Sequence, residues 1–135
     1  MNNKILIMGL FSFLTAFNSC NDTYDFKSVE VDEFATVIQD STVVLLDVRT
    51  AEEYAESHIA HALNLDATQV NFSEEAIQTL PKDRTIAVYC RSGRRSKKAA
   101  NELTKAGFQV VELNKGFNCW TNAQKSIEKG TEEVL

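Results

Sequence analysis

The sequence predicts an α/β domain in which a parallel sheet carries helices on both faces. The first observation is a set of four short apolar runs typical of buried strands, at residues 43–46, 62–65, 86–89 and 110–113. The second is that a segment with helical signals separates each run from the next, which predicts parallel strands joined by helical crossovers. The third is length, because 135 residues suffice for one such domain with a real core and are too few for two ordinary ones.

The predicted helices carry local start and stop signals. Thr50, followed three residues later by Glu53, forms a capping-box pattern at the start of one helix. Pro81 and Gly107 end two others. The expected helices are residues 31–38, 51–57, 73–80, 96–106 and 117–123.

The composition indicates a globular protein that is not a general nucleic-acid binder. The chain is 44% hydrophobic and 24% charged, with a formal net charge of −5, and its sequence pI is near 5.0. Positive charge nevertheless gathers within one short segment, at Arg91, Arg94, Arg95, Lys97 and Lys98. In an acidic protein this cluster indicates focused attraction of a small anion, the alternative being a solvated basic face of a helix.

Residues 1–19 are predicted to be a signal peptide that does not belong to the fold. Residues 5–17 are almost entirely apolar, a length that suits a signal-peptide core and is short for a membrane-spanning helix. The segment closes with Phe-Asn-Ser-Cys, which resembles a bacterial lipoprotein processing site but departs from it at the Phe and Asn positions. Cleavage before Cys20 and lipid attachment there would anchor the protein outside the cytoplasm, in the cell envelope, with residues 20–27 as a tether. An uncleaved anchor and a plain secreted form are the alternatives.

The strongest candidate for chemistry is Cys90, which directly follows the apolar run at residues 86–89. A loop with Gly93 and three arginines comes next, and the helix predicted to start at Ser96 follows the loop. Backbone N–H groups and the positive end of a helix dipole converge at such a junction and favour a thiolate. Cys90 is therefore predicted to be a nucleophile.

Cys119 and His58 are predicted to be structural, with His58 expected to hydrogen-bond a turn and a role in proton transfer as the alternative. Cys119 could pair with Cys90 in an oxidising compartment, but beside two aromatic residues it is interpreted as a small buried hydrophobe. His58 and His61 lack a partner cluster with metal-ligand spacing. Neither a metal site nor a cofactor is expected.

Three motifs, in order along the chain, resemble those of the rhodanese-like sulfurtransferases. Residues 89–96 (Tyr-Cys-Arg-Ser-Gly-Arg-Arg-Ser) resemble the active-site loop of that family, residues 46–59 resemble its upstream motif, and residues 113–120 resemble its closing motif. The resemblance covers residues 28–125. It implies a three-layer α/β/α domain with a mostly parallel five-stranded sheet, followed by a C-terminal tail at residues 126–135.

The sequence departs from the family pattern at four turn positions. Ser57, Ala60 and His61 stand where the family usually has Gly, Pro and Gly, and Lys115 replaces the first glycine of the closing pair. These positions govern the geometry of turns near the site, because glycine adopts backbone conformations that other residues avoid.

The resemblance implies a sulfurtransferase reaction. Cys90, as a thiolate, takes the outer sulfur of a small anionic donor such as thiosulfate and releases sulfite. It then holds the sulfur as a persulfide and passes it to cyanide or a thiol. The residues implied to bind the substrate are Arg91, Ser92, Gly93, Arg94, Arg95 and Ser96. Asp47 and Arg49 are interpreted as residues that orient the loop, a purely structural ion pair being the alternative.

Two other classes of function stay open. Phosphatases of the related Cys-x5-Arg type place an arginine six positions after the cysteine, where this chain has Ser96. A non-catalytic module that binds sulfur species or a partner protein would use the same fold, although the basic loop beside Cys90 argues against it. Neither a nucleic-acid partner nor membrane contact beyond the N-terminal lipid is expected.

Overall fold

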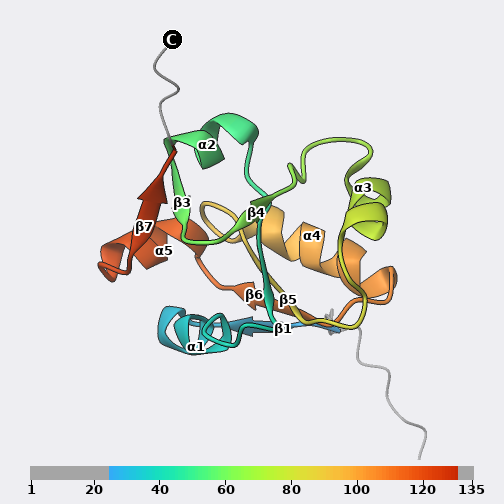
Figure 1. The fold of residues 1–135 in the computed structure, drawn as a ribbon, viewed down its shortest axis with the longest axis horizontal. Helices are drawn as coiled ribbons and strands as arrows, with labels where there is room; N and C mark the ends of the chain where they lie inside the picture. The colour runs from blue at the N-terminus through green and yellow to red at the C-terminus, as the bar shows by residue number, and fades with distance from the viewer. Residues whose placement is uncertain (1–24, 131–135) are drawn as a thin grey trace, which may run out of the picture.

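The computed structural model describes residues 25–130 of the chain (Figure 1). The predicted signal peptide, Cys20 and the tether up to residue 24 lie outside the described residues, as does the predicted tail from residue 131 onward. Within the described part of the chain, no helix has the length and apolar character needed to cross a membrane.

A five-stranded sheet forms the centre of the molecule (Figure 1), with strand order β1-β6-β5-β2-β4 and parallel pairing between all neighbours. The strands are β1 (Lys27–Val29), β2 (Val44–Asp47), β4 (Leu63–Asn64), β5 (Ile86–Tyr89) and β6 (Val110–Leu113). β5 lies in the middle of the sheet and is buried along its whole length. The residue after it therefore emerges at the carboxyl edge of the central strand, where parallel sheets place their sites.

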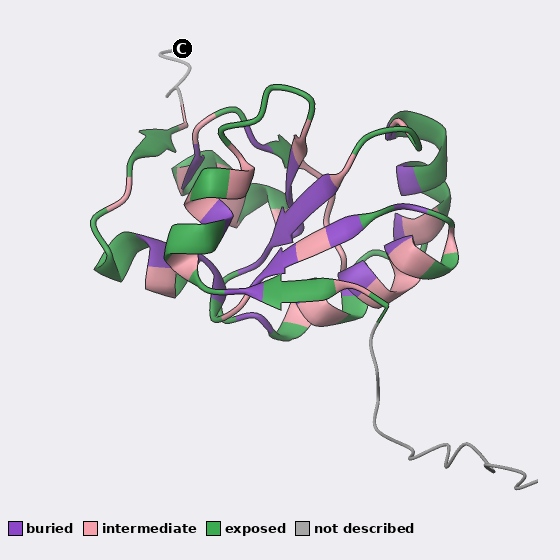
Figure 2. Cartoon of the chain, turned by 90° about the horizontal axis from the view of Figure 1, so that it is seen from below, coloured by how far each residue is buried: buried purple, intermediate pink, exposed green. Residues whose placement is uncertain are grey.

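Helices cover both faces of this sheet, so the predicted three-layer α/β/α architecture is confirmed. They are α1 (Val31–Val37), α2 (Ala51–Glu56), α3 (Phe72–Thr79), α4 (Arg94–Lys105) and α5 (Gly116–Asn122). Side chains of β5 alternate between two apolar clusters, with Ile86 and Val88 in the cluster that α3 and α4 close, and Ala87 and Tyr89 in the cluster that α1 and α5 close. Figure 2 shows the buried strands between helices whose outer faces are exposed.

A second, two-stranded antiparallel sheet pairs β3 (Ser57–Ile59) with β7 (Ile127–Lys129). β7 falls within the segment expected to be a tail, and all its residues are exposed. No apolar pattern marks it in the sequence, because it pairs through its backbone with β3 and buries no side chain. β1 has a similarly weak sequence signal, since only Val29 of its residues is buried. Lys27, expected in the tether, is part of β1.

The ends of all five helices differ from the prediction by one or two residues, and the local backbone explains two of these differences. α4 begins at Arg94 and not at Ser96, because Gly93 takes a left-handed conformation (φ 98°) and is itself the N-cap. α2 ends at Glu56, because Ser57 is extended and begins β3. The predicted capping box at the start of α2 is confirmed.

Candidate active site

Cys90 lies at the carboxyl end of β5, and only 1% of its surface is exposed. The loop that follows it is held from the α5 side by two backbone hydrogen bonds. Phe117 donates its N–H to the Cys90 carbonyl at 2.7 Å, and Asn118 donates to the Arg91 carbonyl at 3.0 Å. These hydrogen bonds fix the loop between the end of the central strand and the start of α5.

The approach of α5 to this loop depends on the turn at residues 115 and 116. Lys115, one of the departures from the family pattern, adopts a left-handed backbone (φ 62°), and Gly116 does the same (φ 60°). A Cβ on Gly116 would collide with the backbone carbonyls of Cys90 and Arg91. Lysine therefore accepts a conformation that glycine favours, at roughly 1–2 kcal/mol, while the glycine that the close approach requires is present.

The turn after β3 also forms, although Ala60 and His61 depart from the family pattern there. His61 takes a left-handed conformation (φ 69°), and the Ala62 N–H donates to the Ile59 carbonyl at 3.1 Å across the turn. His58 Nδ1 donates to the Tyr54 carbonyl at 2.9 Å, and the His58 ring stacks on the Tyr54 ring. These contacts give His58 a structural role in this corner of the fold.

The sulfur of Cys90 has two polar partners. Gly93 donates its backbone N–H to Sγ at 3.1 Å, and the thiol donates to Ser96 Oγ at 3.3 Å. Both partners belong to the first turn of α4 and its cap, so the sulfur lies at the start of that helix. The N–H groups around this junction are suited to binding negative charge.

Two of the three loop arginines are paired with a carboxylate on α2. Glu53 accepts from Arg91 Nε at 3.0 Å and from Arg95 Nη1 at 2.6 Å. The Arg95 hydrogen bond, supported by Arg91, lowers the pKa of Glu53 to about 2, and the same bond raises the pKa of Arg95. An anion that binds Arg91 Nε or the Nη groups of Arg95 has to displace Glu53.

The sequence predicts Glu53 only as a member of the capping box, where it also belongs. Its N–H donates to Thr50 Oγ1 at 3.3 Å, and its carboxylate accepts from the Thr50 N–H at 3.4 Å. The sequence carries no signal for its second role, because the arginines that it binds lie 38 and 42 positions further along the chain.

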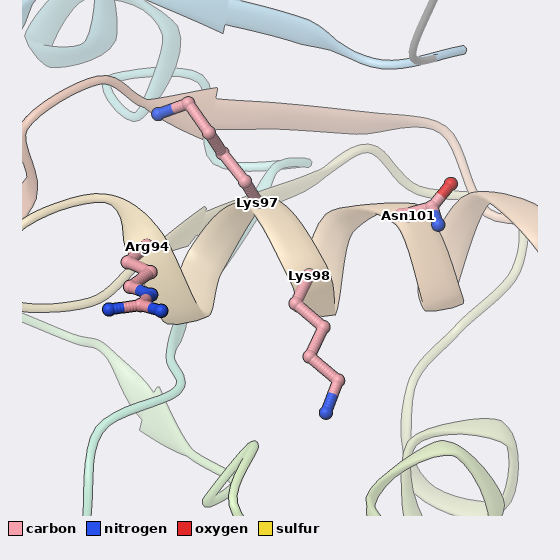
Figure 3. A pocket seen from close by; sticks show the side chains of 4 residues that line it. All are labelled: Arg94, Lys97, Lys98 and Asn101. Carbon is pink, nitrogen blue, oxygen red and sulfur yellow. The ribbon is translucent and has the colours of Figure 1, made fainter. Parts of the chain in front are cut away.

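The third loop arginine lies apart from the other two. Arg94 lines a surface hollow of about 480 Å³ along α4 together with Lys97, Lys98 and Asn101. In Figure 3, Lys97 extends toward the sheet, whereas Arg94 and Lys98 extend the other way. Among the described residues, neither Arg94 nor Lys98 forms an ion pair. Ser92 is exposed in the loop.

Asp47 and Arg49 form a buried ion pair at the end of β2, with Arg49 Nη2 at 2.7 Å from Asp47 Oδ2. The Tyr89 hydroxyl donates to Asp47 at 2.8 Å and accepts from the Ile59 N–H at 3.0 Å. The Arg49 guanidinium lies 4.2 Å from the centre of the Phe117 ring. The ion pair thus contacts Tyr89, the residue before Cys90, and Phe117, whose N–H donates to the Cys90 carbonyl.

Burial shapes the ionisation of this group. Burial, reinforced by the Asp47 charge, raises the pKa of Tyr89 well above its usual range. Burial alone would lower the pKa of Arg49, but its hydrogen bond and charge interaction with Asp47 outweigh that effect and raise the pKa. The guanidinium therefore stays charged inside the core.

One buried polar residue near the sulfur was not predicted. Glu112, on β6, is fully buried and accepts from Ser96 Oγ at 2.7 Å, from Lys97 Nζ at 3.2 Å and from Ser28 Oγ at 2.6 Å. The available signal was a lone carboxylate inside the apolar run at residues 110–113. Such a residue is normally paired when it is buried.

Cys90 and Cys119 both carry free thiols, and Cys119 is half-buried. Within residues 25–130, no group of three or more His, Cys, Asp or Glu side chains has an arrangement that could hold a metal ion.

Comparison with known proteins places this geometry in a family. Residues 30–123 match the rhodanese-like domain. The thiosulfate sulfurtransferase GlpE of Coxiella burnetii is 33% identical over 97 residues, which cover 70% of this chain and 87% of that protein. A "Probable molybdopterin-synthase adenylyltransferase" from Porphyra purpurea is 33% identical over 107 residues, but this chain spans only 27% of its length.

Solved structures agree in fold. The rhodanese-like domain of the Alr3790 protein from Anabaena sp. has a TM-score of 0.69 and 25% identity, covering 80% of this chain and 83% of that one. A rhodanese-like domain protein from Staphylococcus aureus has a TM-score of 0.67 and 25% identity, covering 78% and 100%. The match along residues 30–123, together with a cysteine at the end of the central strand, shows that the chain belongs to the rhodanese-like domain family.

Proposed function

We propose that this protein is a sulfurtransferase that carries sulfane sulfur on Cys90 as a persulfide, with thiosulfate or another persulfide as donor and a thiol or cyanide as acceptor. The observation that carries the proposal is the position of Sγ at the start of α4, within 3.1 Å of the Gly93 N–H. The name of the Coxiella burnetii relative, a thiosulfate sulfurtransferase, supports the choice of donor.

The reaction has two half-reactions. In the first, the Cys90 thiolate attacks the outer sulfur of thiosulfate, an S–S bond forms, and the bond to the sulfonate sulfur breaks with its electron pair leaving on sulfite. In the second, the acceptor attacks the terminal sulfur, and the electron pair of the S–S bond returns to Cys90. N–H groups at the loop and helix start stabilise the charged sulfur throughout, as preorganised donors do in an oxyanion hole.

Arg91 and Arg95 are proposed to bind the sulfonate end of the donor. Both lie against Glu53, so donor binding exchanges one anion for another. Arg91 is 53% exposed and Arg95 28% exposed at the side chain, which leaves both accessible to a small anion. A charge-assisted hydrogen bond of this kind contributes roughly 1.5–3 kcal/mol.

A phosphatase activity is disfavoured by the position six residues after the nucleophile. Ser96 occupies it, and its hydroxyl donates to the buried carboxylate of Glu112. A phosphoryl group seated there would meet a carboxylate where a phosphate site needs a cation. The second candidate is a non-catalytic module that binds sulfur species or a partner protein.

The test is thiocyanate formation from thiosulfate and cyanide by the wild type, by Cys90→Ser and by Cys119→Ala as the matched control. We expect the Cys90 variant to lose turnover and the Cys119 variant to keep it. Wild-type turnover in Cys90→Ser would refute the covalent mechanism. A wild type that neither forms thiocyanate nor takes up sulfur would favour the binding module.

We also propose that the protein is lipidated at Cys20 and anchored in the cell envelope, on the apolar residues 5–17 and the residues that precede Cys20. Expressed in a bacterial host, the wild type should partition with membranes, and Cys20→Ser should move to the soluble extracytoplasmic fraction. Recovery of the wild type in the cytosol with residues 1–19 intact would refute this proposal.

A further inference from the structure

A chain of buried polar groups runs inward from the nucleophile. Cys90 Sγ lies 3.3 Å from Ser96 Oγ, and Ser96 Oγ lies 2.7 Å from Oε1 of Glu112. Cys90 is 1% exposed, and Ser96 and Glu112 are fully buried. The state of the sulfur is therefore coupled to a carboxylate that bulk water does not reach directly.

The two hydrogen bonds that link Cys90, Ser96 and Glu112 both run in one direction, from the thiol toward the carboxylate. An ionised carboxylate only accepts hydrogen bonds, so Glu112 takes the single hydroxyl proton of Ser96. The Ser96 oxygen then faces Cys90 with a lone pair, and the Cys90 thiol proton satisfies it. A thiolate at the same place would meet a lone pair and not a proton, until the Ser96 hydroxyl turned away from Glu112.

We propose that Glu112 is a positioning residue that acts through Ser96 to hold the proton on resting Cys90. This inference rests on the proposed function, in which Cys90 attacks as a thiolate. On ionisation, the thiol proton passes to a base in solvent, and the Ser96 hydroxyl turns from Glu112 to the sulfur. Glu112 keeps the hydrogen bonds from Ser28 and Lys97 while this happens.

Other charged groups act on the sulfur alongside the Ser96 hydroxyl, and most of them lie in ion pairs. These groups come from the loop, α4, α2, β6 and the segment between β4 and α3, and they are Arg91, Arg95, Lys97, Glu53, Glu112 and Asp66. Arg91 and Arg95 share one carboxylate, Glu53, which balances only one of their two charges, so one positive charge remains to favour the thiolate. Lys97 pairs with Glu112 at 3.2 Å. The Gly93 N–H favours the thiolate, and the Glu112 chain opposes it.

The experiment measures the pH dependence of Cys90 alkylation by iodoacetamide in the full chain, with the modified residue located by peptide mass spectrometry. Glu112→Gln keeps the side-chain shape, removes the charge and supplies an amide that can donate to Ser96. We expect the pH midpoint of the alkylation rate to fall by about one unit, which is about a tenfold faster reaction below the midpoint. Glu75→Gln removes the same charge from an exposed position on α3 and should leave the midpoint unchanged.

Two further variants show whether Glu112 acts through the Ser96 hydroxyl or by direct charge repulsion of the Cys90 thiolate. In a Ser96→Ala background, Glu112→Gln should no longer move the midpoint. Ser28→Ala, at an exposed position of the edge strand β1, removes one donor to Glu112 and should raise the midpoint even if Glu112→Gln fails to fold. An unchanged or higher midpoint in folded Glu112→Gln, an equal shift without Ser96, or no rise in Ser28→Ala would overturn the proposal. Alkylation does not require sulfur transfer, so this result is independent of whether the proposed function holds.

Discussion

Replacing Asp47 by Asn should destabilise the protein strongly, although the two side chains have nearly the same shape. The Asp47 carboxylate accepts hydrogen bonds from the backbone N–H, Nε and Nη2 of Arg49 and from the Tyr89 hydroxyl. An amide at this position would place an N–H₂ group against one of these donors. Arg49 would then lose its ion-pair partner and part of this hydrogen-bond set, while keeping the Ser57 carbonyl at 2.7 Å and the face of the Phe117 ring.

The expected magnitude follows from the burial of the pair. Arg49 is 1% exposed, and removing one partner of a buried ion pair typically destabilises a protein by about 3–5 kcal/mol. Total stabilities are about 5–15 kcal/mol, so this is a large share. With a urea m-value of about 2 kcal/mol/M, the unfolding midpoint should fall by about 2 M.

Urea unfolding followed by circular dichroism measures this change. If Asp47→Asn lowered the free energy of unfolding by less than about 1 kcal/mol, this result would refute the reasoning. Such a small change would mean that the buried Arg49 guanidinium does not need the Asp47 carboxylate to compensate its charge. The double variant Asp47→Leu with Arg49→Met removes both charges. It should be less destabilised than the sum of the two single changes.

Three further changes test other parts of the account. Glu53→Gln should lose about 1 kcal/mol at neutral pH. Because folding lowers the pKa of Glu53 from 4.5 to about 2, its contribution is complete above pH 4.5 and fades as the pH falls toward 2, so acid unfolding of the variant should be less steep over that range. Gly116→Ala should cost at least about 2 kcal/mol by thermal melting, since a left-handed alanine there also meets the loop carbonyls. Arg95→Ala should slow sulfur uptake from thiosulfate by about tenfold or more, while transfer from the persulfide to a neutral thiol changes less; equal losses in single-turnover assays would point to a structural role.

The parts of the fold that the sequence predicted are those with local signals. The capping box at Thr50, the stop at Gly107 and the fully apolar run of β5 each depend on a few neighbouring residues, and all three appear in the structure. β7 could not be found in this way, because its partner β3 lies about seventy positions earlier in the chain and none of its side chains is buried.

The site also contains residues with a local sequence signal and residues without one. The junction of Cys90, Gly93 and the helix start is contiguous in the sequence, so its arrangement could be anticipated. The roles of Glu53 and Glu112 could not, because each depends on partners brought together only by the fold, such as Ser28, which is 84 positions from Glu112. These two carboxylates also alter the electrostatics expected from the arginine-rich loop. Glu53 balances part of the positive charge of Arg91 and Arg95, and Glu112 is linked to the sulfur through Ser96.

Intact-mass spectrometry of the protein after incubation with thiosulfate would show whether Cys90 carries sulfur covalently. We expect an added mass of one sulfur atom, located by peptide mapping on Cys90 and lost again when a thiol acceptor is added. An unmodified Cys90 after exposure to thiosulfate and to a persulfide donor, or sulfur found on Cys119 to the same extent, would contradict it.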